Sequence, residues 1–485
     1  MKMNVDKINK NSKAGVRIDR DYMGGVEIPA GAYWGPQTER ARINFQISGI
    51  KQFKEFIIAT AIVKRAAAEA NYKTGHLEKK KAYAIMKAAD DIISGNFDDQ
   101  FVVDIYQAGA GTSHNMNVNE VIANRAIEIL GGSKGDYKLI HPNDHVNMSQ
   151  STNDVIPTSI RIVVVNLTSQ LMDALKQIIN TLNSKAIEFD NIIKPGRTHL
   201  MDAAPVRLGQ EFKAWSIMLE KNITKLIECQ NRLCRLNIGA TAVGTGLNAD
   251  PKYVKYVVNI ISRLTNTKFY ETDFLPEATQ STADFLDLSG TLREIAVDMT
   301  KISNDLRLLN SGPDTAIGEI ELPSVQPGSS IMPGKINPSV VEMMNMVSFH
   351  VIGNDTAIMM ASQAGQLELN VMMPLIGYCL IYNLIILKNS IRTVSNLAIS
   401  GIVANTERIS ELFNSSTGAA LALNPYIGYD KTAEVVKKAV KENKKIEEVV
   451  MEMRLLSRNL VKKIFDPFEL TEMGIAGSNK KRKHN

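Results

Sequence analysis

The feature that most constrains the fold is a series of long amphipathic runs in the middle of the chain. One run places apolar residues three, four or seven positions apart, at Leu208, Phe212, Trp215, Leu219, Ile223, Leu226 and Leu233. Comparable runs extend from Val164 to Leu182 and from Leu288 to Leu309. Apolar residues at this spacing form one narrow stripe along a helix, and other helices must cover that stripe. The runs therefore predict an antiparallel bundle of long helices.

The same periodicity predicts helices in most of the remaining chain. Helical patterns cover about 339–361 and 374–396 in the central region, and about 53–74 and 78–94 before it. A smaller helical segment follows from about residue 405. The predicted fold class is therefore all-α.

These patterns divide the chain into three predicted domains. Residues 1–150 form a mostly helical N-terminal domain, 151–405 form the long-helix bundle, and 406–485 form a small helical C-terminal domain with a basic, disordered tail. Helices this long expose more apolar surface than one chain readily covers. We therefore expect part of that surface to contact other subunits.

Composition places the chain in the soluble globular class, because 44% of its 485 residues are hydrophobic and 22% are charged. The net charge is +5, and four of these charges lie at the end, at Lys480, Lys481, Arg482 and Lys483. We interpret this end as a solvated tail. Binding of nucleic acid through the tail is the alternative, but no basic stripe with interleaved aromatic residues supports it. We predict no nucleic-acid partner.

Neither a membrane anchor nor a disulfide framework is predicted. The longest apolar stretch, from Leu375 to Leu387, has 13 residues, which is too short to span a bilayer. Cys229, Cys234 and Cys379 lack metal or disulfide spacing, so we expect buried free thiols. The N-terminal residues contain no apolar signal segment. We therefore expect a cytoplasmic protein.

Four segments depart from the helical pattern and concentrate small polar residues. They are "GAGTSHNMNVNE" from Gly109, "HPNDHVNMSQSTND" from His141, "GRTHLMDA" from Gly196 and "PGSSIMPGKINP" from Pro327. Hydroxyls, amides and glycine N–H groups bind carboxylates and developing oxyanions, and the starts of helices also favour anions. One such segment alone is usually a helix cap. Four of them beside long helices favour a shared anion site.

Other classes of site are poorly supported. No GxGxxG motif follows a strand, and neither a GxxxxGK[ST] phosphate loop nor a GxSxG elbow is present. His141 and His145 are four positions apart with Asp144 between them, but Pro142 argues against a shared helical face. No third ligand is evident, and we predict no metal ligands.

The four segments together resemble the aspartase/fumarase superfamily. "GSSIMPGKINP" matches its signature, and the other three segments occur in the expected order. The resemblance extends over nearly the whole chain, from "RIDRDYMGGVEIPAGAYWGPQTERARINF" to "ALNPYIGYD". It implies a three-domain fold whose long helices assemble into the core of a homotetramer. It also implies that three subunits contribute to each active site.

Smaller differences favour the aspartase branch over class II fumarases. The chain has "STND" where fumarases usually have SSND, "GTSHN" where they usually have GTQSN, and His145 where they usually have Asp. The implied reaction is the reversible deamination of L-aspartate to fumarate and ammonia, and fumarate hydration is the alternative. A non-catalytic relative is a third hypothesis, which the retained serine, lysine and threonine residues disfavour.

The resemblance implies catalytic roles for three residues. Ser329 would be the general base, and a loop rich in backbone N–H groups, with Lys335 nearby, would stabilise its alkoxide. His199 and Thr198 would position the substrate, and Glu342 occupies the place of the glutamate that pairs with this histidine in fumarases. The loop from Pro327 would act as a mobile lid over the substrate.

The remaining implied roles concern substrate binding. Hydroxyl groups would donate hydrogen bonds to the aci-carboxylate intermediate, Asn153 would sense the amino group, and Asn337 would hold the α-carboxylate with Lys335. The full set of further binding residues is Thr112, Ser151, Thr152, Asn153, Ser330 and Asn337. A second, peripheral dicarboxylate site would comprise His141, Asn143 and Asp144. No cofactor is expected to be required, and activation by a divalent metal stays open.

Overall fold

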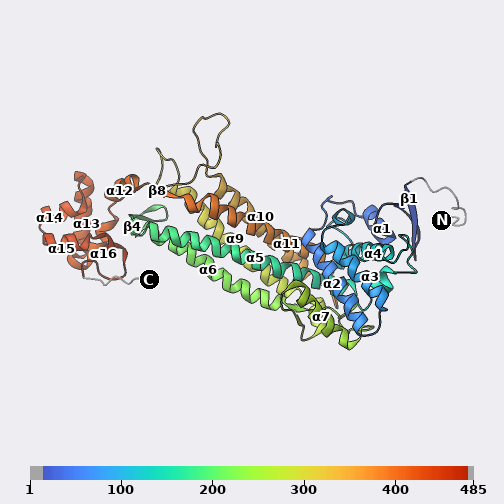
Figure 1. Cartoon of the computed structure of the whole chain (residues 1–485). Helices are drawn as coiled ribbons and strands as arrows, with labels where there is room; N and C mark the ends of the chain where they lie inside the picture. Colours follow the sequence, from blue (N-terminus) through green and yellow to red (C-terminus); the bar gives the residue numbers. More distant parts are fainter. Residues whose placement is uncertain (1–14, 479–485) are drawn as a thin grey trace. The chain divides into compact units, whose positions relative to one another are not determined.

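A computed structural model of the chain describes residues 15–478, and the predicted basic tail from Lys480 lies outside them. The all-α prediction is confirmed, because the few strands within these described residues form only four two-stranded sheets. Five long helices dominate the fold (Figure 1): α5 Thr152–Glu188, α6 Leu208–Leu233, α9 Ala283–Leu309, α10 Ser339–Gln363 and α11 Met373–Leu397.

The predicted apolar stripes are the buried faces of these helices. Along α6, Leu208, Phe212, Leu219 and Leu226 are fully buried, and Leu288, Leu292 and Leu306 are buried in the same way along α9. The long-helix prediction was correct because a stripe with this spacing has no other way to leave water.

Two helices are also long and apolar enough to cross a membrane, by length and composition only. They are Thr152–Glu188 and Met373–Gly401, and 83% and 56% of their most apolar windows are buried inside the protein. The second contains the 13-residue apolar stretch from Leu375 to Leu387. Both belong to the helix bundle, where core helices pass the same test.

The contacts divide the chain into two compact units. One contains the described residues up to 172 together with 224–294 and 349–387, and the other contains 173–223, 295–348 and the described residues from 388. Each unit therefore includes a part of each long helix. The predicted division at residues 150 and 405 was based on the helical patterns along the sequence and not on contacts, and it stays a prediction.

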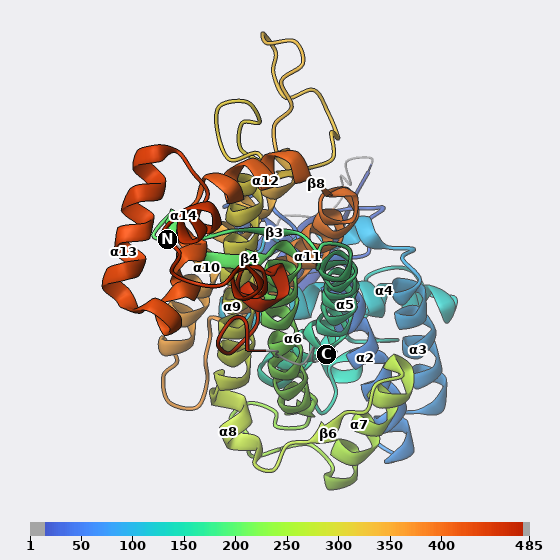
Figure 2. The ribbon, with the colours of Figure 1, turned by 90° about the vertical axis from the view of Figure 1, so that its left-hand side faces the viewer.

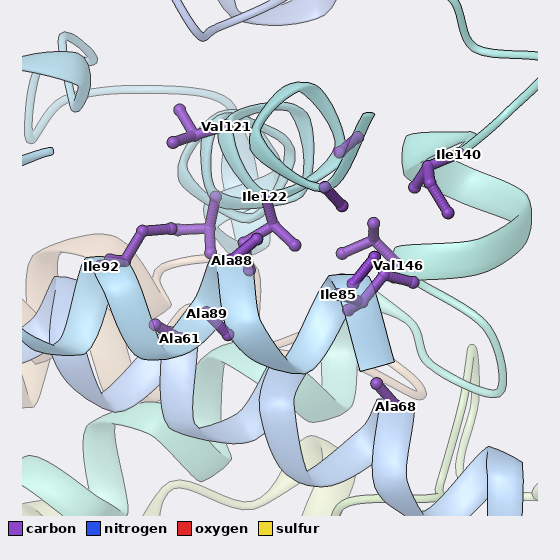
Figure 3. Packing of buried hydrophobic residues seen from close by; sticks show 14 of the residues in the cluster. Ala61, Ala68, Ile85, Ala88, Ala89, Ile92, Val121, Ile122, Ile140 and Val146 are labelled. Atoms are coloured by element: carbon purple, nitrogen blue, oxygen red, sulfur yellow. The ribbon is translucent and has the colours of Figure 1, made fainter. Parts of the chain in front are cut away.

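The first unit contains a helical core near the N-terminus. Its elements are β1 Val16–Asp21, β2 Gly24–Pro29, α1 Pro36–Asn44, α2 Lys54–Lys73, α3 Lys79–Ile93, α4 Thr112–Ile129, β5 Arg235–Leu236, α7 Pro251–Thr265, β6 Tyr270–Glu271 and α8 Leu275–Gln280. Figure 3 shows how Ala61 and Ala68 of α2 face Ile85, Ala88 and Ala89 of α3. Alanine at the contact lets these helices approach closely, and Val121 and Ile122 of α4 complete the core.

The second unit contains two short sheets and a group of small helices. Its elements are β3 Ile193–Thr198, β4 Met201–Arg207, β7 Ile320–Glu321, β8 Val403–Ala404, α12 Thr406–Ser415, α13 Asn424–Glu442, α14 Ile446–Glu452, α15 Arg458–Ile464 and α16 Pro467–Thr471. Strands β3 and β4 form an antiparallel hairpin, and β7 pairs with β8. Figure 2 shows the chain between α9 and α10, drawn in dark yellow, as an extended loop without helix.

Candidate active site

The predicted site residues fall into two groups, one in each compact unit. Thr112, Ser151, Thr152 and Asn153 lie in the first unit. Thr198, His199, Ser329, Ser330, Lys335 and Asn337 lie in the second. We call residues 324–338 the serine loop.

The first group is built on the starts of two helices. Thr112 is the first residue of α4, and its exposed hydroxyl donates to the carbonyl of Gly109 at 3.3 Å. The preceding residue, Gly111, has a φ of +90° and lies against Ile156, so a larger residue would be both strained and crowded there. Most of the segment from Gly109 belongs to α4, so it is helical and not a loop as its composition suggested. Its polar residues lie at the start of a helix, where anions are favoured.

The start of α5 is fixed by its own side chains. The Ser151 N–H donates to Asp154 Oδ1 at 2.9 Å, and the Asn153 N–H donates to Ser151 Oγ at 3.2 Å. The Asn153 side chain donates to the carbonyl of Ala242 at 2.7 Å. These contacts hold Ser151, Thr152 and Asn153 in place before any ligand binds.

A buried lysine, which sequence reasoning missed, is linked to this group by hydrogen bonds. Lys64 of α2 is fully buried, and its Nζ donates to Asn147 Oδ1 at 2.9 Å and Gln150 Oε1 at 3.0 Å. Asn147 Oδ1 also accepts from Asn115 Nδ2 at 3.3 Å, and Asn115 Nδ2 donates to Thr152 Oγ1 at 3.2 Å. Lys64 is thereby linked to the hydroxyl of Thr152 through two amide side chains. We call Lys64, Asn115, Asn147, Gln150 and Thr152 the amide network.

Asp154 supplies the opposite charge and is also fully buried. Its Oδ2 accepts from the N–H groups of Gly239 and Thr241, each at 3.0 Å. Burial raises the pKa of Asp154 to about 7, against the effect of these N–H donors and of Lys64. Burial lowers the pKa of Lys64 to about 7, and the negative charge of Asp154 opposes that shift. The two groups are therefore coupled in a site from which water is excluded.

The predicted second dicarboxylate site forms a single turn. Pro142–Val146 is a π-helical turn in which His141 Nδ1 accepts from the N–H groups of Asn143 and Asp144, each at 3.2 Å. Nδ1 also lies 3.4 Å from Asp144 Oδ2. The imidazole of His141 therefore accepts from the backbone N–H groups of Asn143 and Asp144, and the binding of a dicarboxylate there stays a prediction. Across residues 15–478, no cluster of three or more His, Cys, Asp or Glu is placed to hold a metal.

The second group begins at the tip of the β3–β4 hairpin. Thr198 is the last residue of β3, and His199 and Leu200 form the two-residue turn with φ values of +54° and +61°. Two consecutive positive φ values are typical of the turn that joins twisted antiparallel strands. All three side chains are exposed, so the hairpin presents Thr198 and His199 to solvent.

The serine loop folds around the hydroxyl of Ser329. Ser329 Oγ accepts from the N–H groups of Ile331 and Met332, at 3.2 and 2.9 Å. The Gly328 N–H donates to the carbonyl of Lys335 at 2.9 Å, and the Asn337 side chain donates to the carbonyl of Gly328. A side chain at Gly328 would collide with this backbone, since its Cβ would lie 2.4 Å from the Asn337 nitrogen. The loop lines an open hollow of about 430 Å³.

Two backbone N–H donors surround the Ser329 hydroxyl, and its role as the base stays a prediction. Two backbone N–H groups directed at one oxygen favour its negatively charged form. Ser330 and Lys335 are exposed in the same loop, and Asn337 is half-buried. Glu342 lies in the first turn of α10, and its pairing with His199 stays a prediction. The three cysteines are buried and free, as predicted.

Comparison with known proteins agrees with this assembly of segments. The lyase family model matches residues 24–353, and the model of the fumarase C C-terminus matches residues 421–472. Aspartate ammonia-lyase of Bacillus subtilis (strain 168) is 45% identical over 467 residues, covering 96% of this chain and 98% of the relative. Class II fumarate hydratase of Ralstonia nicotianae is 44% identical over 436 residues, covering 90% of this chain and 95% of the relative.

A solved structure shows the same fold. The crystal structure of a fumarate lyase:delta crystallin from Brucella melitensis, bound to cobalt, has a TM-score of 0.90 and 44% identity, and the match covers 93% of this chain and 98% of that chain. The class of carbon–nitrogen lyase predicted from the sequence agrees with the family and with the relatives named aspartate ammonia-lyase. The chain therefore belongs to the lyase family, within the aspartase/fumarase superfamily.

Proposed function

We propose that the protein is an aspartate ammonia-lyase, which converts L-aspartate reversibly to fumarate and ammonia. The observation that carries this proposal is the environment of Ser329, whose hydroxyl accepts from two backbone N–H groups in an exposed loop. The names of the relatives that are 44–46% identical support the choice of substrate.

The difficulty of the reaction explains the residues. Ser329 Oγ takes the proton from the carbon beside the β-carboxylate, and the electron pair moves into that carboxylate. The resulting aci-carboxylate carries two negative charges. The electrons then return to form the carbon–carbon double bond as the carbon–nitrogen bond breaks and ammonia leaves. Each fixed donor directed at the aci-carboxylate is worth about 3 kcal/mol.

The roles divide between the two groups. In the first unit, Thr112, Ser151 and Thr152 donate hydrogen bonds to the aci-carboxylate, and Asn153 contacts the amino group. Their positions are set by the helix starts and by Asp154 and the amide network. This group is neutral at its surface, so it stabilises charge through dipoles.

In the second unit, Ser329 is the base, and Ser330 adds a donor to the aci-carboxylate. Lys335 and Asn337 hold the α-carboxylate, while Thr198 and His199 position the substrate. Lys335 is exposed in the structure. The Lys335 ammonium is therefore removed from water only when substrate covers the loop.

We propose that the active enzyme is a cytoplasmic homotetramer whose active sites are shared between subunits. Helix α10 exposes large apolar side chains that one chain leaves uncovered, including Met346 at 65%, Phe349 at 59% and Met360 at 54%. Exposed apolar surface of this kind marks an interface. Sedimentation at micromolar concentration should give four times the chain mass, and a monomer would refute this assembly.

No cofactor is needed for the proposed steps, since every proton and charge is handled by side chains or backbone. Activation by a divalent metal is a separate question, and cobalt is bound to the Brucella melitensis relative. Adding and then chelating a divalent metal while following turnover tests it. We expect the metal-free enzyme to retain activity.

Class II fumarase is the second candidate, and the Ralstonia nicotianae relative favours it. Purified protein should be incubated with L-aspartate and, separately, with malate, while the absorbance of fumarate is followed. The proposal predicts fumarate from L-aspartate and little from malate. Consumption of malate alone would replace the proposed function by fumarate hydration.

A further inference from the structure

Four charged side chains cluster around the buried Glu319 in the second unit, and Lys194 is buried with it while Arg197 and Glu211 are half-buried. Glu319 is fully buried, and its two oxygens lie 3.0 Å from Lys194 Nζ and 2.8 Å from Arg197 Nη1. Lys194 is also buried and lies 2.9 Å from Glu211 Oε1. Burial raises the pKa of Glu211, while Lys194 opposes that shift. The cluster holds two cations and two carboxyl groups outside the residues assigned to substrate.

The two cations belong to the strand that carries the hairpin tip. Lys194 and Arg197 lie on β3, and Thr198 and His199 follow Arg197 directly. A displacement of Arg197 would therefore be passed to the residues that position the substrate. The strand itself has a bulge between Pro195 and Arg197, so its regular pairing alone does not fix the last residues.

Glu319 lies where the chain enters the serine loop. Its backbone is held on both sides, because its N–H donates to the carbonyl of Leu309 and its carbonyl accepts from the N–H of Asn405, each at 2.9 Å. Strand β7 follows immediately, and Ser329 is ten positions further along. Glu319 is thus a fixed point between helix α9 and the loop.

The serine loop has few other attachments. Within residues 15–478, the hydrogen bonds of the serine loop have their partners in the loop itself or in the first turn of α10. The loop is therefore positioned through its two ends. At the end that begins at Glu319, the buried carboxylate of this residue contacts Lys194 and Arg197 of the hairpin.

We propose that Glu319 is a positioning residue that holds the hairpin tip with His199 and the base of the serine loop in one register. The proposal rests on the proposed function, since it concerns the residues assigned to catalysis there. Glu319 touches no reacting atom. It acts through Lys194 and Arg197 on one side and through the loop base on the other.

The test compares Glu319→Gln with Glu321→Gln, a matched control two residues away whose side chain is exposed. The glutamine keeps the shape of Glu319 and removes only its charge. Fumarate formation from L-aspartate should show kcat reduced about tenfold to a hundredfold in Glu319→Gln, as expected when catalytic groups are displaced by a fraction of an ångström. KM should rise as well, because the displaced segments carry Thr198, His199, Lys335 and Asn337, which hold or position the substrate in the proposed function.

Arg197→Lys provides a second variant if Glu319→Gln folds poorly. It keeps the positive charge and replaces the planar guanidinium, which a lysine cannot imitate. It should lower kcat in the same direction, and combining it with Glu319→Gln should add little further loss. A kcat for both single variants equal to that of Glu321→Gln would overturn the proposal.

Hydrogen exchange makes the test independent of turnover. Amides of β3 and β4 and of residues 317–322 should exchange faster in Glu319→Gln than in Glu321→Gln, while those of α2 stay unchanged. Unchanged exchange in both segments would refute the proposal even if the wild type proved inactive. Wild-type protein that makes no fumarate from L-aspartate, with the exchange result as expected, would instead refute only the proposed function.

Discussion

The amide network and the serine loop differ in how firmly the rest of the protein holds them. The network lies on three helices and their connections, is anchored by the fully buried Lys64, and directs fixed dipoles outward. The serine loop is exposed, with Ile331 at 84% and Met332 at 49% accessible. It bonds mainly to itself. Groups that only stabilise charge gain from rigidity, whereas a base on a loop can approach the substrate after it has bound.

This contrast predicts that substitutions in the loop reduce turnover without destabilising the protein. Substitutions in the network should reduce both. Four variants test it, in order of expected effect.

Ser329→Ala should have the largest effect. It removes the proposed base, so kcat should fall about a thousandfold or more, while the oligomeric state and the melting temperature stay unchanged. Initial rates of fumarate formation and sedimentation measure the two halves of the prediction. Ser330→Ala is the matched control, because it removes one donor and leaves the base, and it should lose less. Equal losses in the two variants would mean that neither serine is the base.

Lys64→Met should reduce both stability and turnover. It removes the buried ammonium that donates to Asn147 and Gln150 and leaves Gln150 Oε1 without its donor, which costs about 1–3 kcal/mol of unfolding free energy. It also removes a hydrogen bond from Asn147, which is linked through Asn115 to the hydroxyl of Thr152. Thr152 should then be less well placed for substrate, and kcat/KM should fall. Denaturant unfolding at fixed protein concentration gives the free energy. Lys54 lies on the same helix with its side chain 56% exposed, so Lys54→Met is the control and should change stability and turnover little. A similar loss in Lys54→Met would show that the amide network has no special role.

Gly328→Ala should separate the two regions most sharply. Its new Cβ would meet the backbone of Asn337, so the loop must rearrange around Ser329. We expect kcat to fall about a hundredfold with no change in melting temperature. Gly334→Ala is the control, since its Cβ would meet nothing within 4 Å, and only its φ of +82° is unfavourable. A large drop in melting temperature for Gly328→Ala would contradict a loop that is independent of the core.

The smallest expected effect is a pH dependence in the first unit. His114 is buried, stacks on Phe56 with ring centroids 4.6 Å apart, and contacts Thr60 Oγ1 at 3.1 Å. Burial and the charge of Lys64 lower its pKa from 6.5 to about 3. Below pH 6.5 the unfolded chain binds a proton that the folded chain does not, so this stability is complete above pH 6.5 and is lost as the pH falls.

The loss should approach about 1.4 kcal/mol per pH unit below 6.5. Unfolding free energies at pH 7.0, 6.0 and 5.0 should therefore fall more steeply in wild type than in His114→Gln. His350→Gln, on an exposed residue of α10, should keep the wild-type slope. If the unfolding free energy fell equally with pH in wild type and His114→Gln, the pH dependence would not come from a buried neutral His114.

Sequence reasoning found the long helices because their apolar spacing has only one structural solution. It assigned roles to Ser329 and Lys335 from a motif whose residues lie close together in the chain, and these assignments stay predictions. It missed Lys64, because one lysine within an alanine-rich helix reads as a surface residue, and its partner Asn147 is 83 positions away. Glu319 was missed for the same reason. Contacts between distant segments leave no local pattern.

The contrast between a rigid binding group and a loop that supplies the base can be tested in one titration. Calorimetry should compare the binding of succinate, a dicarboxylate that cannot react, to wild type and to Ser329→Ala. The account predicts the same Kd for both proteins, because the base is not needed to bind a dicarboxylate. A Kd that rises in proportion to the lost kcat would contradict it and would make Ser329 a binding residue.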